Sequence, residues 1–508
     1  MPLMYCHAKL KNISQHTVIS AHLFLPDYSP MNRDSFYPAI ACFPLLLMLA
    51  GCAPMHETRQ ALSQQTPAVQ VDTALPTALK NGWPDSQWWL EYHDNQLTSL
   101  INNALQNAPD MQVAEQRIQL AEAQAKAVAT QDGPQLDFSA DMERQKMSAE
   151  GLMGPFALND PAAGTTGPWY TNGTFGLTAG WHLDIWGKNR AEVTARLGTV
   201  KARAAEREQT RQLLAGSVAR LYWEWQTQAA LNTVLQQIEK EQNTIIATDR
   251  QLYQNGMTSS VEGVETDINA SKTRQQLNDV AGKMKIIEAR LSALTNHQTK
   301  ALKLNPVALP KVASQLPDEL GYSLLARRAD LQAAHWYVES SLSTIDAAKA
   351  AFYPDINLMA FLQQDALHLS DLFRHSAQQM GVTAGLTLPI FDSGRLNANL
   401  DIAKAESNLS IASYNKAVVE AVNDVARAAS QVQTLAEKNQ HQAQIERDAL
   451  RVVGLAQARF NAGIIAGSRV SEARIPALRE RANGLLLQGQ WLDASIQLTG
   501  ALGGGYKR

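Results

Sequence analysis

Two stretches of the chain alternate apolar and polar residues, and they are copies of each other. Residues 176–190 and 381–395 share Gly, Thr, Ala, Gly, Leu, Ile and Arg at matching places, 205 positions apart (381 − 176). From Phe175 to Ile185 every second residue is apolar, which predicts a strand with one apolar and one polar face. Each copy then runs through Gly187 or Gly394 into a long polar helical segment. A duplicated unit of amphipathic strand and long helix therefore underlies the chain.

A second alternating segment precedes each copy. Residues 148–171, rich in glycine and proline, and residues 366–379 read as the loops that join the two strands of each repeat. We therefore expect one β-hairpin per repeat, with strands near 135–147, 172–186, 355–365 and 380–391. The apolar positions of the preceding strands are Leu136, Phe138, Ala140 and Met142, and then Ile356, Leu358, Ala360 and Leu362.

The length of these strands suits a membrane. A strand that crosses a bilayer needs roughly nine to eleven residues. Four strands are too few to close a barrel, and an open strand edge in lipid leaves backbone groups unpaired at a cost of several kcal/mol each. If the apolar faces contact lipid, several copies of the chain must contribute to one barrel.

Helical periodicity fills the rest of both repeats. The pattern over 95–131 is split by Pro109, which predicts two helices. Long helices are expected over 187–253 and 392–460, each about 100 Å long at 1.5 Å per residue. Their apolar residues follow a seven-residue rhythm typical of coiled-coil packing. A rod-like coiled coil is the alternative, but a rod has no use for lipid-facing hairpins, so we favour a helical tube.

Both long helices end at matching turns. Tyr253-Gln-Asn-Gly256 and Phe460-Asn-Ala-Gly463 lie 207 positions apart (460 − 253), and their glycines fit left-handed helix caps. Antiparallel helices should then return to about Thr295 and Thr499.

The N-terminal region carries a secretion signal that begins late. Met31-Asn-Arg33 is a short positive start, residues 39–49 are apolar but too short to span a bilayer, and Leu49-Ala50-Gly51-Cys52 resembles a bacterial lipobox. We expect synthesis to start at Met31, with Cys52 lipidated as the first residue of the mature protein. Ala53, where an inner-membrane retention signal would have Asp, favours the outer membrane. A soluble signal peptide with a chance cysteine is the alternative.

Composition excludes several classes of protein. The formal charge of −3 argues against nucleic acid as a partner. The three cysteines all lie at or before Cys52, so the body has no disulfide framework and no cysteine nucleophile or metal ligand. Gly-x-Ser-x-Gly and His-Glu-x-x-His motifs and a Walker-type phosphate loop are missing, so we expect no enzyme activity, no metal and no cofactor beyond the covalent lipid. The aromatic cluster from Trp83 to Tyr92 fits a packing anchor better than a sugar contact.

Several motifs make the chain similar to a known family. Residues 181–190, 326–331, 347–354 and 388–395 resemble the outer membrane factor (TolC-like) family, the exit ducts of bacterial efflux pumps and type I secretion systems. The chain most resembles the lipoprotein branch, and it is similar to multidrug-resistance outer membrane proteins of enteric bacteria. The resemblance covers about 83–500 and implies an α+β membrane protein of three identical chains. It implies four transmembrane strands per chain, a barrel of about twelve strands built by the three chains, and a periplasmic helical barrel.

These patterns divide the chain into segments. We expect an upstream extension (1–30), a lipoprotein signal peptide (31–51), a lipid-anchored tether with an equatorial packing segment (52–94), a first repeat (95–297), a linker (298–317), a second repeat (318–500) and a tail (501–508).

The resemblance implies a passive outer membrane channel that conducts drugs or other small toxic compounds outward, driven by an inner-membrane pump through a periplasmic adaptor. The adaptor contact at the periplasmic tip would be Asn255, Gly256, Met257, Ala462, Gly463 and Ile464. Residues near the closed aperture would be Glu262, Glu265, Arg469 and Glu472; Arg469 stands where the family tends to carry a carboxylate, so a mixed-sign ring should attract cations less. Candidates to line the barrel lumen are Asp137, Asp141, Glu143, His182 and Asp184, although exposure to water alone would explain any one of them. A type I secretion duct, a periplasmic adaptor and a lipid-anchored cell-wall-binding protein are the alternatives.

Overall fold

The structure is a computed structural model, and it describes residues 55, 61–65, 79–80, 82–148, 169–257, 259–296, 302–311, 314–315, 324 and 326–506. The chain divides into two units, Met1–Cys52 and Ala53–Arg508. All described residues belong to the second unit, which contains both repeats.

The four predicted strands form one antiparallel sheet. They are β2 (Gln135–Lys146), β3 (Trp169–Leu183), β5 (Asp355–Ala366) and β6 (Gln378–Thr387), in the spatial order β2-β3-β5-β6. The register places Leu177 opposite Phe138 on one side and Leu362 on the other, and Leu362 opposite Met380. Because directly paired residues point to the same side of a sheet, the apolar positions of all four strands share one face.

Two strand ends differ from the prediction. β3 ends at Leu183 and not near 186, and β6 ends at Thr387 and not near 391. Pro389 has no N–H to donate to a ladder, and the residues after each strand form the turn that starts the next helix. Polar side chains in these turns bind backbone groups of the helix, so the chain leaves the sheet early.

The helices form a layer in which each repeat contributes corresponding elements. The first repeat has α2 (Asn95–Asn107), α3 (Pro109–Ala129), α4 (Lys188–Gln254) and α5 (Ser260–Leu294); the second has α7 (Ala329–Ala350), α8 (Arg395–Asn461) and α9 (Gly467–Ala501). α4 and α8 contain 67 residues each. Pro109 is the first residue of α3, where its missing N–H costs nothing. Across the described residues, no helix is long and apolar enough to cross a bilayer.

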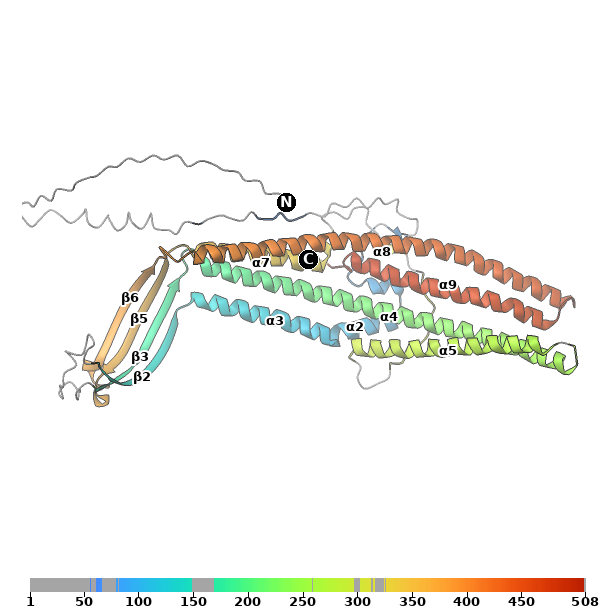
Figure 1. Ribbon diagram of the computed structural model, residues 1–508, viewed down its shortest axis with the longest axis horizontal. Helices are drawn as coiled ribbons and strands as arrows, with labels where there is room; N and C mark the ends of the chain where they lie inside the picture. Colours follow the sequence, from blue (N-terminus) through green and yellow to red (C-terminus); the bar gives the residue numbers. More distant parts are fainter. Residues whose placement is uncertain are drawn as a thin grey trace, which may run out of the picture. The chain divides into compact units, whose positions relative to one another are not determined.

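Contacts between helices define the order of this layer. Near the sheet α4 packs against α3 and α7, and α7 packs against α8; farther away α4 packs against α5 and α9, and α9 packs against α8. Figure 1 shows the sheet at one end of this layer and the turns after α4 and α8 at the other. Helices α3 and α5 therefore form one edge of the layer, and α8 forms the other.

Aromatic packing fixes the middle of the layer. Trp88 and Trp89, in the short helix η1 (Trp88–Tyr92), are 6% and 2% exposed. The ring of Tyr92 lies 5.3 Å from that of Trp223 on α4. Burial, with a smaller effect of Glu91, raises the pKa of the Tyr92 phenol. The prediction that this cluster is a packing anchor is confirmed.

Glutamine side chains hold the linker between the repeats. Gln96 accepts a hydrogen bond from the backbone N–H of Asn305 (3.0 Å), and Gln226 accepts one from the N–H of Val307 (2.8 Å). Gln488 on α9 donates to two linker carbonyls. The backbone groups of an extended segment outside a sheet have no neighbouring strand to bond to, and these glutamine side chains supply the hydrogen bonds instead.

Part of the predicted tether, within residues 61–65, is bound to α8. The N–H of Leu62 donates to Asn408 Oδ1 (2.9 Å), and the N–H of Gln65 donates to Asn415 Oδ1 (2.7 Å). Asn415 Nδ2 also donates to the carbonyl of Ser63 (3.0 Å). The seven residues from Asn408 to Asn415 rise about 10.5 Å along the helix, and the three from Leu62 to Gln65 span about 10 Å when extended. The spacing of the two asparagines therefore matches the spacing of the two N–H groups that they bind.

Candidate functional site

The polar face of the sheet collects most of the residues predicted to line a lumen. Asp137 pairs with Thr178 and Asp141 with Thr174, so both carboxylates point away from the apolar face, as does Glu143. His182 lies on the same side, with its Nδ1 3.4 Å from Asp355 Oδ2. The sheet therefore has one face bearing carboxylates and one apolar face.

Asp184 does not belong to this set. Its two carboxylate oxygens accept hydrogen bonds from the backbone N–H groups of Asn189 (3.1 Å) and Arg190 (2.9 Å), and only 14% of its side chain is exposed. These N–H groups belong to the first turn of α4, where backbone N–H groups have no acceptor within the helix. We therefore assign Asp184 to capping of α4 and not to the lumen.

The second repeat has the same device at Asp392. Its carboxylate accepts hydrogen bonds from the N–H groups of Gly394 (3.0 Å) and Leu396 (2.8 Å) at the start of α8. Gly187 and Gly394 both adopt left-handed φ values, +76° and +86°. An aspartate shortly before a glycine and a long helix is a capping signal that sequence reasoning could have used for Asp392.

The two turns predicted as the tip have the same backbone structure. Gly256 N–H donates to Tyr253 O (2.9 Å) and Met257 N–H to Leu252 O (2.8 Å). In the second repeat, Gly463 and Ile464 make the corresponding bonds to Phe460 and Arg459, at 2.9 Å each. Both turns are Schellman caps with glycine at positive φ, as predicted. The side chains of the predicted contact set, including Asn255 and Ala462, are exposed, Met257 by 66% and Ile464 by 70%.

The aperture candidates differ between the repeats. Arg469 Nη1 lies 2.7 Å from Glu472 Oε2, three residues on along α9, so the two charges neutralise each other locally. Glu265 on α5 is exposed. The side chain of Glu262 lies outside the described part of the chain.

Arg474, which the sequence did not single out, connects three helices. It lies on α9, with its guanidinium 3.3 Å from Glu241 Oε1 on α4 and 3.2 Å from Gln457 Oε1 on α8. Because α9 packs between α4 and α8, this one side chain joins the hairpin of the first repeat to that of the second. Nothing in local sequence spacing indicates such a contact.

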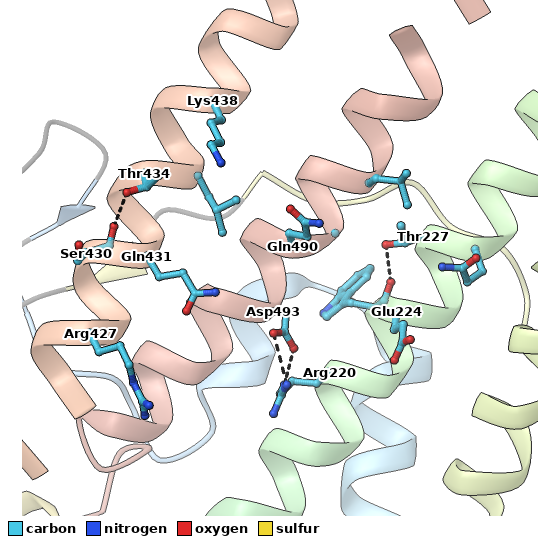
Figure 2. A pocket seen from close by; sticks show the side chains of 15 residues that line it. Arg220, Glu224, Thr227, Arg427, Ser430, Gln431, Thr434, Lys438, Gln490 and Asp493 are labelled. Carbon is cyan, nitrogen blue, oxygen red and sulfur yellow. Dashed lines mark hydrogen bonds and ion pairs between the residues drawn. The ribbon is translucent and has the colours of Figure 1, made fainter. Parts of the chain in front are cut away.

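A polar pocket of about 700 Å³ lies between α4, α8 and α9. Figure 2 shows Arg220 paired with Asp493, and Arg427 and Lys438 on the neighbouring helix. Its wall therefore carries both signs of charge.

The pocket and the linker lie on opposite faces of the layer. Gln226 binds the linker, whereas Glu224 and Gln228, two positions away, line the pocket. Likewise Gln488 binds the linker and Gln490 lines the pocket. Two residues correspond to about 200° around a helix, which places the two sets on opposite sides.

Cys52 and the lipobox residues Leu49, Ala50 and Gly51 lie outside the described residues. Among those described, no group of three or more His, Cys, Asp or Glu side chains could hold a metal ion.

Comparison with known proteins gives the arrangement its context. A family model described as "Outer membrane efflux protein" matches residues 100–297 and 320–504. The chain belongs to the outer membrane efflux protein family. The two matched ranges are the two structural repeats, and the family consists of outer membrane channels, not enzymes.

Individual members of the outer membrane efflux protein family confirm this placement. The chain is 98% identical over 478 residues to the multidrug resistance outer membrane protein MdtQ of Escherichia coli O157:H7, covering 94% of this chain and 100% of the relative. It is 36% identical over 466 residues to MdtP of Shigella flexneri, covering 91% and 94%. The crystal structure of the outer membrane protein VceC from Vibrio cholerae matches with a TM-score of 0.70 and 25% identity, covering 84% of this chain and all of that one.

These findings confirm the resemblance and the fold class predicted from the sequence. The chain is an outer membrane efflux channel protein with an internally duplicated fold of four strands and long helical hairpins.

Proposed function

We propose that three copies of this chain form a lipid-anchored exit duct of a tripartite efflux system, which an inner-membrane pump drives through a periplasmic adaptor. The duct conducts passively: substrate enters between the helices at the tip and leaves through the barrel.

One observation carries this proposal: within the part of the chain that the structure describes, both edges of the sheet are unpaired and most of its apolar face is exposed, apart from contacts of the β5–β6 loop at Gly173 and Phe175. β2 and β6 each pair on one side only. Phe138, Met142, Met380 and Val382 on the apolar face are 67%, 69%, 67% and 81% exposed. Three such sheets, joined β2 to β6, would give a closed barrel of about twelve strands with that face toward lipid.

The height of the apolar face fits a bilayer. Trp181 and Trp169 lie on the apolar side of β3, twelve positions apart, and are 42% and 45% exposed. Twelve residues of strand span about 41 Å, or about 29 Å across the membrane at a tilt of about 45°. Membrane barrels carry aromatic girdles at both borders of an apolar band of roughly this height.

The helical layer has open edges as well. Leu120 on α3 and Ile268 on α5 are 60% and 50% exposed at one edge, and Leu409 and Leu455 on α8 are 68% and 61% exposed at the other. Association of α8 with α3 and α5 of the next copy would bury both rows.

The bound tether supports the lipid anchor on Cys52. Leu62 is held at Asn408, thirteen residues along α8 from Arg395, or about 20 Å from the start of the helix. The ten residue steps from Cys52 to Leu62 can span about 34 Å. The lipid can therefore reach the level at which the sheet begins, which is the expected membrane surface.

Drugs or other small toxic compounds are the proposed substrates, supported by the name of the relatives as multidrug resistance proteins. The tip turns around Gly256 and Gly463 supply the adaptor contact. The mixed-charge pocket of Figure 2 faces away from the linker and would line the duct. Such a wall favours no single sign of solute.

Assembly and transport test the proposal together. The full chain should give heat-modifiable trimers in outer membrane fractions and form conducting pores in planar bilayers. Cys52→Ser should lose palmitate labelling and still form trimers in detergent. Deletion in a pump-sensitised strain should raise sensitivity to dyes and antibiotics.

Other outcomes would overturn parts of the proposal. A detergent-independent monomer whose apolar face is packed within itself would exclude the duct. Loss of polypeptide export without any change in drug sensitivity would favour a type I secretion duct. Digestion of cell wall in a zymogram would point to the cell-wall alternative.

A further inference from the structure

Charges on the strands are sorted by sign between the two faces of the sheet. All five carboxylates point to the polar face: Asp137, Asp141, Glu143, Asp355 and Asp365. The only Arg and Lys residues of the four strands, Arg144 and Lys146, alternate with Glu143 and Gln145 and so project from the apolar face. Both are exposed.

The two cations lie at the border of the apolar band, at the end of the sheet away from the helices. Lys146 pairs with Trp169 and Arg144 with Thr171. The guanidinium of Arg144 lies 5.9 Å from the ring centre of Trp169, and its Nη1 donates to Thr171 Oγ1 (3.2 Å). Met142, the next residue inward on this face, is 69% exposed and apolar.

The loop between β5 and β6 contacts the same face of the sheet, four to six positions of β3 inward from Trp169. Its residue Leu372 lies so close to Gly173 that a Cβ there would be 2.9 Å from Leu372 Cδ1. Phe373 packs on Phe175 with ring centres 5.6 Å apart. Gly173 and Phe175 both belong to the apolar side of β3, so this loop folds over the outside of the sheet and not over its polar face.

Two side chains of this loop are strongly exposed. Phe373 is 84% exposed, although it is apolar. The next residue, Arg374, is 70% exposed and is paired with Asp371 at 3.1 Å. We call Arg144, Lys146 and Trp169, at the end of the sheet, the rim patch.

We propose that the rim patch binds the phosphate-bearing headgroups of lipids in the leaflet farther from the helices. This inference rests on the proposed function, because it requires the apolar face to be in a bilayer. Trp169 contacts the acyl chains next to the headgroup, while Arg144 and Lys146 extend to its phosphate. A guanidinium binds phosphate through two parallel N–H groups, and an ammonium adds a point charge.

Charge complementarity selects this occupant. On the described strands the outward cations have no outward carboxylate beside them, so an anionic ligand would add a charge interaction that these strands do not supply. The adjoining surface is apolar, so that ligand must also carry hydrocarbon. A phosphate-bearing lipid has both, whereas an acidic peptide in water would leave Met142 and Trp169 uncovered.

The test uses the full chain assembled in detergent micelles, with bound lipids counted by native mass spectrometry. Dioleoyl phosphatidic acid and dioleoyl phosphatidylcholine are titrated separately, and inorganic phosphate is added as a competitor. The variant is Arg144→Gln with Lys146→Gln. The control is Lys416→Gln, which removes an exposed cation from α8, where Lys416 pairs with Glu420 at 3.6 Å.

Wild type and control should prefer phosphatidic acid, and millimolar phosphate should not displace it. Each cation near a membrane surface changes lipid affinity about fivefold, so the double variant should bind phosphatidic acid about 30-fold more weakly. Equal phosphatidic acid binding by variant and wild type would overturn the inference. Displacement by phosphate alone, or equal binding of the two lipids by wild type, would overturn it as well.

Trimer formation and bilayer conductance of the same preparations separate this inference from the proposed function. Trimers that conduct but show no lipid preference would refute the rim patch and leave the duct intact. Failure of the wild type to form trimers or pores would refute the duct, and the rim patch with it.

Discussion

Replacement of Arg474 by glutamine should loosen the closed tip. Arg474 is the side chain that joins α9 to Glu241 on α4 and to Gln457 on α8. If substrate enters when a partner separates these helices, each contact that must break stabilises the closed state. Glutamine is polar but uncharged and two bonds shorter than arginine, so the change removes both the charge and the reach to Glu241 and Gln457.

The size of the effect follows from exposure. The Arg474 side chain is 43% exposed and that of Glu241 17%, so solvent screens the pair on one side. Such a pair contributes about 0.5 kcal/mol, in the middle of the range for exposed ion pairs. Three copies give about 1.5 kcal/mol, which would raise the ratio of open to closed channels about tenfold.

The assay is the open fraction of single channels in planar bilayers without adaptor. Glu241→Gln should raise it by a similar factor, and the double variant should add little, because either change already breaks the pair. Arg479→Gln, an exposed position one turn farther along α9, is the control and should change nothing. An unchanged open fraction in Arg474→Gln, or additive effects in the double variant, would refute the proposal that the Arg474–Glu241 pair holds the tip closed.

The remaining predictions concern assembly and stability, each read as the temperature at which heat-modifiable trimers dissociate. Gly176→Val should lower it strongly, because a Cβ at Gly176 would lie 2.5 Å from the backbone of β5; Gly180→Ala, with open space around it, should be neutral. Asp392→Ala should cost about 1 kcal/mol per chain through the lost cap of α8, and Asp392→Asn should retain most of it. Tyr222→Phe should cost about 1–3 kcal/mol, because it removes the 2.6 Å hydrogen bond to Asp94; an unchanged temperature would show that water replaces it.

Features that depend on backbone geometry could be predicted from the sequence. Gly256 and Gly463 were identified as left-handed caps because few other residues adopt positive φ at low cost, and both do adopt it. The strict alternation in the strands predicts which side chains share a face, because residues paired across neighbouring strands point to the same side of the sheet. Pro109 marked a helix boundary for the same kind of reason.

Contacts between distant residues could not be predicted. The pairing of Arg474 with Glu241 spans 233 positions, and that of Leu62 with Asn408 spans 346. Each depends on which helices pack together and at what height, which a period of seven does not specify. Asp184 was misassigned because continuing the strand by one residue placed it on the polar face, whereas its carboxylate instead caps α4.

Comparison of the two repeats shows which constraints act on this fold. Both repeats keep an aspartate before the long helix and a glycine after it, because the unpaired backbone groups at either end of a 67-residue helix need partners in each copy. Their tips have diverged in charge: Glu265 is exposed on α5, whereas Glu472 is neutralised by Arg469 on α9. In a threefold assembly the two hairpins would alternate around the aperture, so acidic and neutral positions would alternate too. The backbone of the tip is therefore fixed by helix termination, while its charge pattern is free to change with the partner and the solute.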